Sequence, residues 1–358
     1  MDLSRGFPHL LETFLVSSNP EVCSLFVTWS QFEALPIGKW MICWVTGASG
    51  QIGSELCRQL TAVEMEVIGI GRGSPPKFFP HRWVTWNIGV EDRPSAQLMV
   101  PDVVIHLAGQ TSAYRARAAL EEDIRLNVLG FAQVLLAALE LGGNPFVVAA
   151  GAATEVGLLE ASMINDEHAD HPQTFYDVAK VTQGLYLQQF AAEGWLSGCR
   201  VRFANVYGGV HRGDTDRGFL NRAVRRALAG EPLTYFADGS YIRDFVHVSD
   251  AASALRAAAA NKNLTVGETF MLGTGQGTPI RAALEVISRV VYEVTGVTAP
   301  VTQGEPMDGL YPIERRDVVI DSGRFASLTG WSPTTTLEMG IRGMVESLSK
   351  TGAIKLSR

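Results

Sequence analysis

The sequence predicts an α/β protein with a doubly wound parallel sheet and a smaller C-terminal lobe. From Met41 onward, short continuous apolar runs alternate with amphipathic stretches. Continuous apolar runs are typical of parallel strands buried on both faces. After about Gly208 this rhythm changes to longer segments punctuated by glycine and proline. Because crossovers between parallel strands are right-handed, helices on both faces of one sheet are the simplest arrangement.

The apolar runs and the periodic segments between them give the expected elements. The predicted strands are Ile42–Thr46, Glu66–Ile70, Val103–Leu107, Phe146–Ala150, Arg200–Phe203 and Thr269–Leu272. The helical patterns are Gln51–Leu60, Ile124–Leu141 and Tyr176–Glu193. We assign residues 41–208 and about 243–276 to the sheet domain, and about 209–242 with 277–358 to the smaller lobe.

Residues 1–40 differ from the rest of the chain. They include Pro8, Pro20 and Pro36, and no helical or strand period persists through them. We expect an N-terminal extension that is poorly ordered or arises from a misplaced start site; a packed arm is the alternative.

Composition excludes several classes of protein. The formal net charge is −7 and the basic residues are scattered, which argues against a nucleic-acid partner. No stretch approaches the roughly 20 apolar residues of a membrane span, and no signal peptide is recognisable. The cysteines, Cys23, Cys43, Cys57 and Cys199, lack metal-ligand spacing and indicate free thiols in a reducing compartment. We therefore expect a cytoplasmic protein with no metal site and no membrane partner.

A glycine-rich turn follows the first predicted strand. It reads Gly47-Ala48-Ser49-Gly50-Gln51-Ile52-Gly53 and leads into a predicted helix. Glycines in this setting allow a tight turn and let backbone N–H groups approach a pyrophosphate at the helix N-terminus. The spacing G-x-x-G-x-x-G is a variant of the dinucleotide-binding fingerprint.

The end of the second predicted strand bears on the choice of cofactor. An acidic residue there favours NAD, whereas an arginine accommodates the 2′-phosphate of NADP. The sequence is Ile70-Gly71-Arg72-Gly73, without an acid. Arg72 favours NADP over NAD, and a solvated loop residue is the alternative.

Tyr176 and Lys180 form a candidate catalytic pair. Their i, i+4 spacing places them on one face of a helix. A free tyrosine is a poor acid or base at neutral pH, and a neighbouring ammonium favours its phenolate. The pair therefore predicts proton transfer by Tyr176, assisted by Lys180.

Taken together, the ordered motifs resemble one known family. They are T-G-A-S-G-Q-I-G, H-L-A-G at His106–Gly109, Asn127, Y-D-V-A-K, R-F-A-N-V-Y-G at Arg202–Gly208, I-R-D-F-V-H-V-S-D at Ile242–Asp250 and G-W-S-P-T-T-T-L-E-M-G-I at Gly330–Ile341. From Met41 to about Met344 the chain is similar to extended short-chain dehydrogenases/reductases of the nucleotide-sugar epimerase/dehydratase branch. The resemblance implies a Rossmann-type NAD(P)-binding domain followed by a substrate-binding lobe.

The resemblance also implies residue roles. Tyr176 would be the general acid/base, and Lys180 would bind the nicotinamide ribose and depress the pKa of the tyrosine. The cofactor would contact Gly47, Ser49, Gly50, Gln51, Ile52, Gly53, Arg72, Leu107, Ala108, Gly109, Asn127, Tyr176 and Lys180. The nucleotide-sugar would contact Thr111, Asn205, Arg243 and one of Arg315 and Arg316, with Arg316 preferred. A local salt bridge to Asp244 is the alternative for Arg243.

One position departs from the family pattern. The family places a Ser or Thr after the fourth long strand to bind the reacting oxygen, and the count back from Gly157 puts Ala152 there. Thr154 is the nearest substitute, and it is the third candidate catalytic residue. The family's 4,6-dehydratases carry Asp-Glu after this Thr; here only Glu155 is near, out of register, which disfavours dehydration.

Two reactions remain open. A 4-epimerase would oxidise and re-reduce the sugar with tightly held NAD, and we place it first; an NADPH-dependent 4-keto-6-deoxy-sugar reductase is the alternative. A catalytically silent nucleotide-binding protein is a third hypothesis, supported by Ala152. The resemblance further implies a homodimer formed through the Ile124–Leu141 and Tyr176 helices.

Overall fold

The computed structural model describes residues 41–63, 65–77, 79–159, 163–209, 218–305 and 312–350. The expected extension, residues 1–40, lies outside the described residues.

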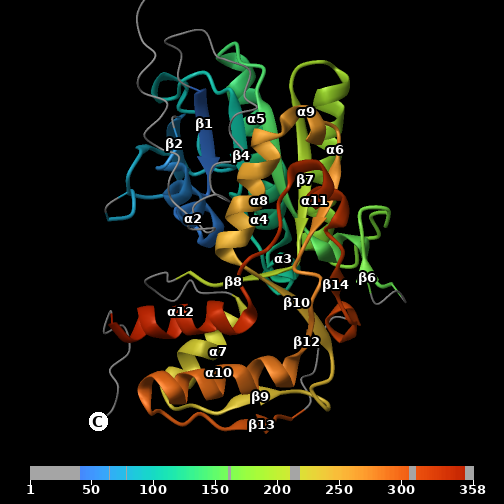
Figure 1. The fold of residues 1–358 in the computed structure, drawn as a ribbon. Coiled ribbons are helices and arrows are strands. Elements are labelled where there is room, and N and C mark those ends of the chain that lie inside the picture. Colours follow the sequence, from blue (N-terminus) through green and yellow to red (C-terminus); the bar gives the residue numbers. More distant parts are fainter. Residues whose placement is uncertain are drawn as a thin grey trace, which may run out of the picture.

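A seven-stranded parallel sheet forms the centre of the molecule and confirms the predicted fold class (Figure 1). Its strand order is β11-β7-β5-β4-β1-β2-β3, with every neighbouring pair parallel. The strands are β1 (Met41–Thr46), β2 (Met65–Gly71), β3 (Arg82–Thr85), β4 (Val103–His106), β5 (Phe146–Ala152), β7 (Ser197–Phe203) and β11 (Thr269–Leu272). The edge strand β3 was not predicted, because four residues with two exposed side chains lack the apolar signature of a buried strand.

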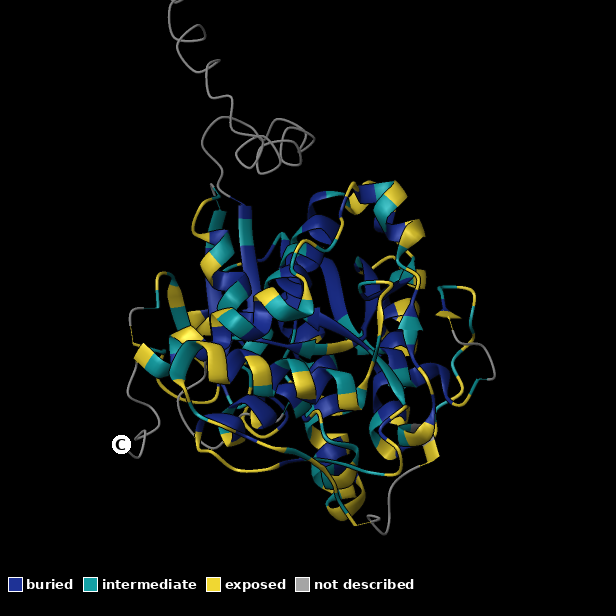
Figure 2. Cartoon of the chain, turned by 60° about the horizontal axis from the view of Figure 1, so that its bottom comes forward, coloured by how far each residue is buried: buried dark blue, intermediate teal, exposed yellow. Residues whose placement is uncertain are grey.

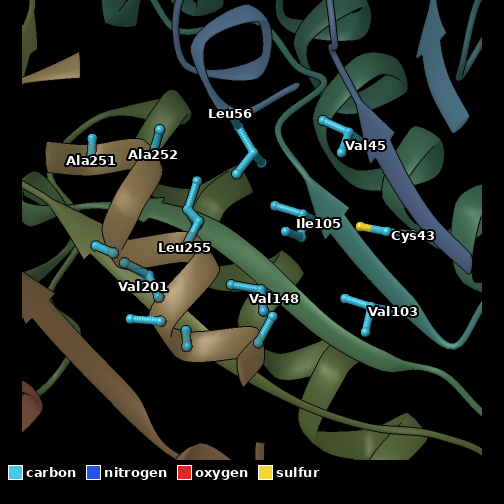
Figure 3. Close-up of a cluster of buried hydrophobic side chains, with 14 of the residues drawn as sticks. Cys43, Val45, Leu56, Val103, Ile105, Val148, Val201, Ala251, Ala252 and Leu255 are labelled. Carbon is cyan, nitrogen blue, oxygen red and sulfur yellow. The ribbon is translucent and has the colours of Figure 1, made fainter. Parts of the chain in front are cut away.

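Helices cover both faces of this sheet. On one face, α2 (Gln51–Leu60) and α8 (Val248–Ala260) direct Leu56 and Leu255 toward the strands, where side chains such as Val148 complete the core (Figure 3). On the other face, α5 (Gly130–Glu140) and α6 (Phe175–Ala192) pack apolar side chains against Trp44 and its neighbours. Burial on both faces explains why the central strands are continuously apolar.

The predicted helix Ile124–Leu141 consists of two parts. Ile124–Leu129 forms a π-helical turn, η2, and α5 follows it from Gly130. The carbonyl of Asn127 accepts a hydrogen bond from Gln183 Nε2 at 2.5 Å. A π turn widens the helix and is typical of functional sites, and periodicity alone does not reveal it.

A second group of elements lies below the sheet in Figure 1 and has its own core, which includes Tyr207, Phe245 and Ile287. It comprises β8 (Asn205–Tyr207), α7 (Phe219–Leu228), β9 (Leu233–Tyr235), β10 (Ile242–His247), β12 (Gly277–Pro279), α10 (Ile280–Thr295), β13 (Val301–Gln303) and α12 (Leu337–Lys350). Within residues 277–358, α11 (Gly323–Thr329) instead packs Phe325 against Phe270 of the sheet, with ring centroids 5.0 Å apart.

Short elements lie in the connections between these strands and helices. They are η1 (Ser95–Gln97), α3 (Ala113–Ala118), α4 (Leu120–Asp123), η3 (Ala153–Val156), β6 (Met163–Ile164), α9 (Lys262–Thr265), η4 (Pro312–Arg315) and β14 (Val319–Ile320). Buried residues concentrate in the strands, and exposed residues lie along the outer sides of the helices (Figure 2). Among the described residues, no helix combines the length and apolarity needed to cross a membrane.

Candidate active site

The strand order of the sheet reverses its direction between β1 and β4. From β1 the chain proceeds to β2 and β3 on one side, whereas β4 leads to β5 and β7 on the other. Ligands of open α/β sheets bind at the carboxyl ends of strands where the order reverses in this way. The glycine turn follows β1 and the His106–Gly109 segment follows β4, so the topology brings these two predicted segments together.

The glycine turn fits closely against the segment after β4. Gly47 has a φ of +66°, and a Cβ there would lie 2.8 Å from Ala108 N. Thr46 Oγ1 accepts hydrogen bonds from the backbone N–H groups of Leu107 at 3.0 Å and Ala108 at 3.1 Å. A Cβ on Gly53 would lie 2.3 Å from Gly47 O. The absence of side chains at Gly47 and Gly53 is therefore a requirement of this turn.

The helix that follows the turn suits a dinucleotide phosphate. Gly50 is the N-cap of α2, so this end of the helix lacks a side-chain hydrogen bond from its N-cap residue. An uncapped N-terminus with exposed Ser49 and Gly50 matches the requirements of an anion. Gln51 Nε2 donates to Gly208 O at 2.8 Å and so joins α2 to the residue after β8. Ile52 packs against the core below α2.

Arg72 lies directly after β2 and is exposed. A Cβ on the preceding Gly71 would lie 3.4 Å from Ser49 Oγ, which places the end of β2 beside the glycine turn. Arg72 therefore lies at the same edge of the sheet as the glycine turn.

Tyr176 and Lys180 lie in the first turns of α6. Thr174 and Asp177 form a capping box that fixes the start of this helix: Thr174 Oγ1 accepts from Asp177 N at 3.1 Å, and Asp177 Oδ2 accepts from Thr174 N at 3.1 Å. Lys180 Nζ donates to Ala150 O at 2.9 Å and to Gln183 Oε1 at 3.0 Å. Lys180 is buried and Tyr176 is half-buried.

The electrostatics of this pair differ from the expectation. Burial lowers the pKa of Lys180 to about 8, although the carboxylates of Glu155 and Asp123 act in the opposite direction. Burial also raises the pKa of Tyr176 above its usual range, and Glu155, Asp177 and Asp123 raise it further. Burial and these three nearby acids therefore favour the neutral phenol of Tyr176 over its phenolate.

Asn127 connects the crevice to the catalytic helix. Its Oδ1 accepts from Gln110 N at 3.0 Å, and its Nδ2 donates to Asp123 Oδ1 at 2.9 Å. A Cβ on Gly109 would lie 2.4 Å from Asn127 Oδ1 and 4.0 Å from Lys180 Nζ. Gly109, Asn127 and Lys180 are therefore neighbours in space. Thr111 is exposed at the start of the next loop.

The segment after β5 offers few donors to a substrate. Ala152 carries no hydroxyl, and its backbone N–H donates to Glu155 Oε1 at 2.6 Å. Thr154 Oγ1 donates to Asp177 Oδ1 at 2.5 Å. To serve as the missing proton donor, Thr154 would have to exchange that bond, so its catalytic role stays a prediction. Glu155 is fully buried and bonded to the backbone, which does not suit an acid that must reach a substrate.

Two arginines meet beside this segment. Arg243 of β10 donates to the carbonyl oxygens of Ile242 at 2.9 Å, Glu314 at 2.5 Å and Arg316. Arg316 Nη2 donates to Ala153 O at 3.1 Å, while its Nε and Nη1 are buried and have no hydrogen-bond partner among the described residues. Burial, followed by the charge of Arg243, lowers the pKa of Arg316 to about 10. A buried guanidinium with donors unsatisfied among the described residues, next to a second guanidinium, matches the requirements of an anion.

The surroundings of the arginine pair bear on the sequence alternatives. The carboxylate of Asp244 accepts from Thr274, Gly275 and Ile320, so its hydrogen bonds go elsewhere than to Arg243. Arg316 is buried, whereas Arg315 is exposed. Asn205 is exposed on β8, which pairs with β10.

Sequence reasoning missed several buried polar residues around Tyr176 and Lys180. Gln183, Asp123 and Asp177 are buried and bonded to predicted site residues. Gln183 follows Lys180 by three residues and so shares its helix face, which is a signal the sequence contained. Among the described residues, no group of three His, Cys, Asp or Glu side chains is arranged to hold a metal ion.

Comparison with known proteins places this geometry in a family. The model of the NAD dependent epimerase/dehydratase family matches residues 43–273. The chain belongs to this family. Relatives in the epimerase/dehydratase family include nucleotide-sugar epimerases, reductases and decarboxylases.

Individual epimerase/dehydratase relatives are distant but cover most of the chain. A UDP-glucose 4-epimerase from Mycolicibacterium smegmatis is 27% identical over 84% of this chain and 96% of its own length. A GDP-6-deoxy-D-mannose reductase from Pseudomonas aeruginosa is 27% identical over 69% of this chain and 80% of its own length. The solved structure of a Thermotoga maritima UDP-glucose 4-epimerase with UDP-glucose is 26% identical, covers 87% of this chain and 99% of that chain, and has a TM-score of 0.76.

Proposed function

We propose that the protein is an NAD(P)-dependent nucleotide-sugar epimerase that inverts the sugar hydroxyl at C4. The observation that carries the proposal is the convergence of Tyr176 and Lys180 with the glycine turn and with the Arg243–Arg316 pair. The glycine turn fits a dinucleotide, because Gly47 leaves no space for a Cβ and α2 begins without a side-chain cap. When bound, the nicotinamide ring supplies the chemistry of hydride exchange at its C4.

The protein residues divide the remaining tasks. Arg243 and Arg316 bind the diphosphate of the nucleotide-sugar, with Asn205 on the neighbouring strand. Thr111 borders the sugar. Lys180 holds the nicotinamide ribose, and Asn127 together with Gln183 fixes the lysine side chain. Tyr176 gives a proton to the reacting oxygen or takes one from it, in step with the hydride.

The reductase is the second candidate, because two observations favour it. Arg72 at the end of β2 suits the 2′-phosphate of NADP. The raised pKa of Tyr176 keeps the phenol protonated, as a proton donor in ketone reduction requires. The 27% identity to a GDP-6-deoxy-mannose reductase agrees with this alternative.

Proton NMR of the sugar product tests the proposal. The purified protein is incubated with UDP-glucose and NAD, and separately with a 4-keto-6-deoxy nucleotide-sugar and NADPH. We expect UDP-galactose in the first mixture, and a loss of about 10²–10⁴-fold in rate for Tyr176→Phe. A product only in the second mixture would establish the reductase. Equal turnover by Tyr176→Phe would contradict both reactions.

A homodimer is part of the proposal. The π turn and α6 expose apolar side chains, among them Ile124 (49% exposed), Leu129 (49%) and Leu185 (57%). Exposed apolar side chains on adjacent helices are typical of an interface between copies. Light scattering of the purified chain is expected to give twice the monomer mass, and a monomer mass would contradict this part.

A further inference from the structure

We propose that Gln183 is a positioning residue that joins the ammonium of Lys180 to the π turn at Asn127 and, through that turn, to the segment after β4. This inference deepens the proposed function and rests on its assignment of Lys180 to the nicotinamide ribose. None of the sequence motifs includes Gln183, and its side chain is buried, with 1% exposed.

The amide of Gln183 is hydrogen-bonded at both ends. Its Nε2 donates to Asn127 O at 2.5 Å, and its Oε1 accepts from Lys180 Nζ at 3.0 Å. Because an ammonium only donates and a carbonyl oxygen only accepts, one orientation of the amide satisfies both partners. An apolar side chain of the same length would serve neither partner, and a carboxylate would serve only Lys180.

The carbonyl of Asn127 belongs to the π turn. This turn, η2, spans Ile124–Leu129, and the N–H of Gly130 donates to Arg125 O, five residues earlier. Such bonds widen a helix locally and are frequent at functional sites. Asn127 lies within the turn, and its carbonyl accepts a donor from a different helix. The π turn and Gln183 therefore form one unit.

The side chain of Asn127 extends this connection to the segment after β4. Its Oδ1 accepts from Gln110 N at 3.0 Å, and its Nδ2 donates to Gln110 O at 3.1 Å. Gln110 directly follows the His106–Gly109 segment, and a Cβ on Gly109 would lie 2.4 Å from Asn127 Oδ1. Hydrogen bonds thus lead from Lys180 to the segment that the proposed function assigns to the dinucleotide.

Two of the three N–H groups of the Lys180 ammonium have acceptors among the described residues. Ala150 O lies 2.9 Å from Nζ, and Gln183 Oε1 lies 3.0 Å from it. Because the nitrogen is tetrahedral, these two bonds determine the direction of the third N–H. A Cβ on Gly109 would lie 4.0 Å from Nζ, so the ammonium lies beside the segment after β4. Gln183 therefore fixes a single donor of Lys180 for a ligand at this segment, and binding need not order the lysine first.

Burial makes the ammonium sensitive to the loss of this partner. It lowers the pKa of Lys180 to about 8, while Glu155 and Asp123 act in the opposite direction. A hydrogen bond to the charged form of a group favours that form. Loss of the Gln183 acceptor should therefore lower the pKa of Lys180 further, and an ammonium without a fixed direction should hold a ligand less well.

The test is a double-mutant cycle on dinucleotide binding, with NADH and NADPH as probes and fluorescence as the signal. Gln183→Met keeps the side-chain length and removes both hydrogen bonds. We expect it to raise the dissociation constant about tenfold in the wild-type chain and by less than about threefold in the Lys180→Met variant. Equal effects in the two chains would overturn the proposal, because a merely structural role is independent of Lys180.

Gln189→Met is the matched control. Gln189 lies further along the same helix, is exposed, and its amide donates to Glu193 Oε1 at 2.9 Å. The substitution has the same chemistry but removes no contact of Lys180, so the dissociation constant should equal that of wild type. A similar loss of affinity in this variant would refute the role assigned to the buried amide.

Two further measurements cover the cases in which folding or binding fails. If Gln183→Met does not fold, the side-chain amide of Gln183 is followed by NMR in the wild-type chain; its hydrogens should exchange slowly with solvent, and fast exchange would contradict the bridge. If the chain binds neither dinucleotide, the proposed function is wrong, but an NMR titration of ¹³C-labelled lysine Cε still decides the role of Gln183. The pKa of Lys180 should be lower in Gln183→Met than in wild type, and equal values would exclude the bridge.

Discussion

Two edges of the crevice are built in different ways. At the edge formed by β1, α2 and the segment after β4, the site consists of backbone, and it depends on the missing Cβ atoms of Gly47 and Gly53. At the edge formed by β5, α6 and η3, buried polar side chains such as Lys180 and Glu155 hydrogen-bond to the backbone at the end of β5. Under the proposed function, the first edge binds the dinucleotide, a ligand common to many proteins, and the second edge determines the reaction.

The contrast between the two edges predicts that a substitution in the Arg243–Arg316 pair has the largest effect on substrate binding. Arg316→Met removes a buried cation whose Nε and Nη1 have no partner in the part of the chain that the structure describes. We expect the dissociation constant for the nucleotide-sugar to rise about 10- to 100-fold, the cost of about 1.5–3 kcal/mol for a charged hydrogen bond. Calorimetry measures this dissociation constant, and the affinity of the variant for the dinucleotide should not change.

Arg315→Gln is the control for this variant, because Arg315 is the exposed neighbour of Arg316. It should bind the nucleotide-sugar as wild type does. Equal weakening in both variants would show that net charge, rather than the Arg316 guanidinium, determines affinity.

The glycine edge should respond to a single methyl group. Gly47→Ala places a Cβ 2.8 Å from Ala108 N in a left-handed conformation. We expect a loss of about 1–3 kcal/mol in the free energy of unfolding, and weaker dinucleotide binding by about tenfold. Denaturant titration and fluorescence binding measure these two effects. Gly73→Ala is the control, because a Cβ there meets no atom within 4 Å; a similar loss in this variant would refute the steric explanation.

The smallest expected effect concerns the residue that departs from the family. Ala152→Ser adds a hydroxyl at the end of β5, where the backbone N–H already binds Glu155. A further donor to the reacting oxygen should raise the turnover rate by up to about tenfold. Thr154→Val is the comparison, and it should mainly destabilise the start of α6 through loss of the bond to Asp177. If Thr154→Val abolishes turnover instead, Thr154 is the donor.

The sequence predicted the glycine edge well because its determinants are local. The turn, the strand before it and the helix Gln51–Leu60 follow one another within a few residues, and α2 has the predicted bounds. All six predicted strands of the sheet are present. The edge strand β3 escaped notice because it is short and partly exposed.

The other edge was predicted less completely, because its contacts join distant segments. The Arg200–Glu155 pair links β7 to η3, and Arg316 reaches Ala153, which lies 163 positions earlier in the sequence. The π turn at Asn127 depends on Gln183 of another helix. The expected lowering of the Tyr176 pKa was derived from Lys180 alone, and it failed to include the buried acids around the pair.

Native mass spectrometry of the purified chain with added NAD or NADPH tests the central claim most directly. The account predicts one nicotinamide dinucleotide per chain, and its mass identifies which of the two is held. NAD would favour the epimerase and NADPH the reductase. A chain that binds neither dinucleotide would contradict the assignment of the glycine turn, and with it the proposed function.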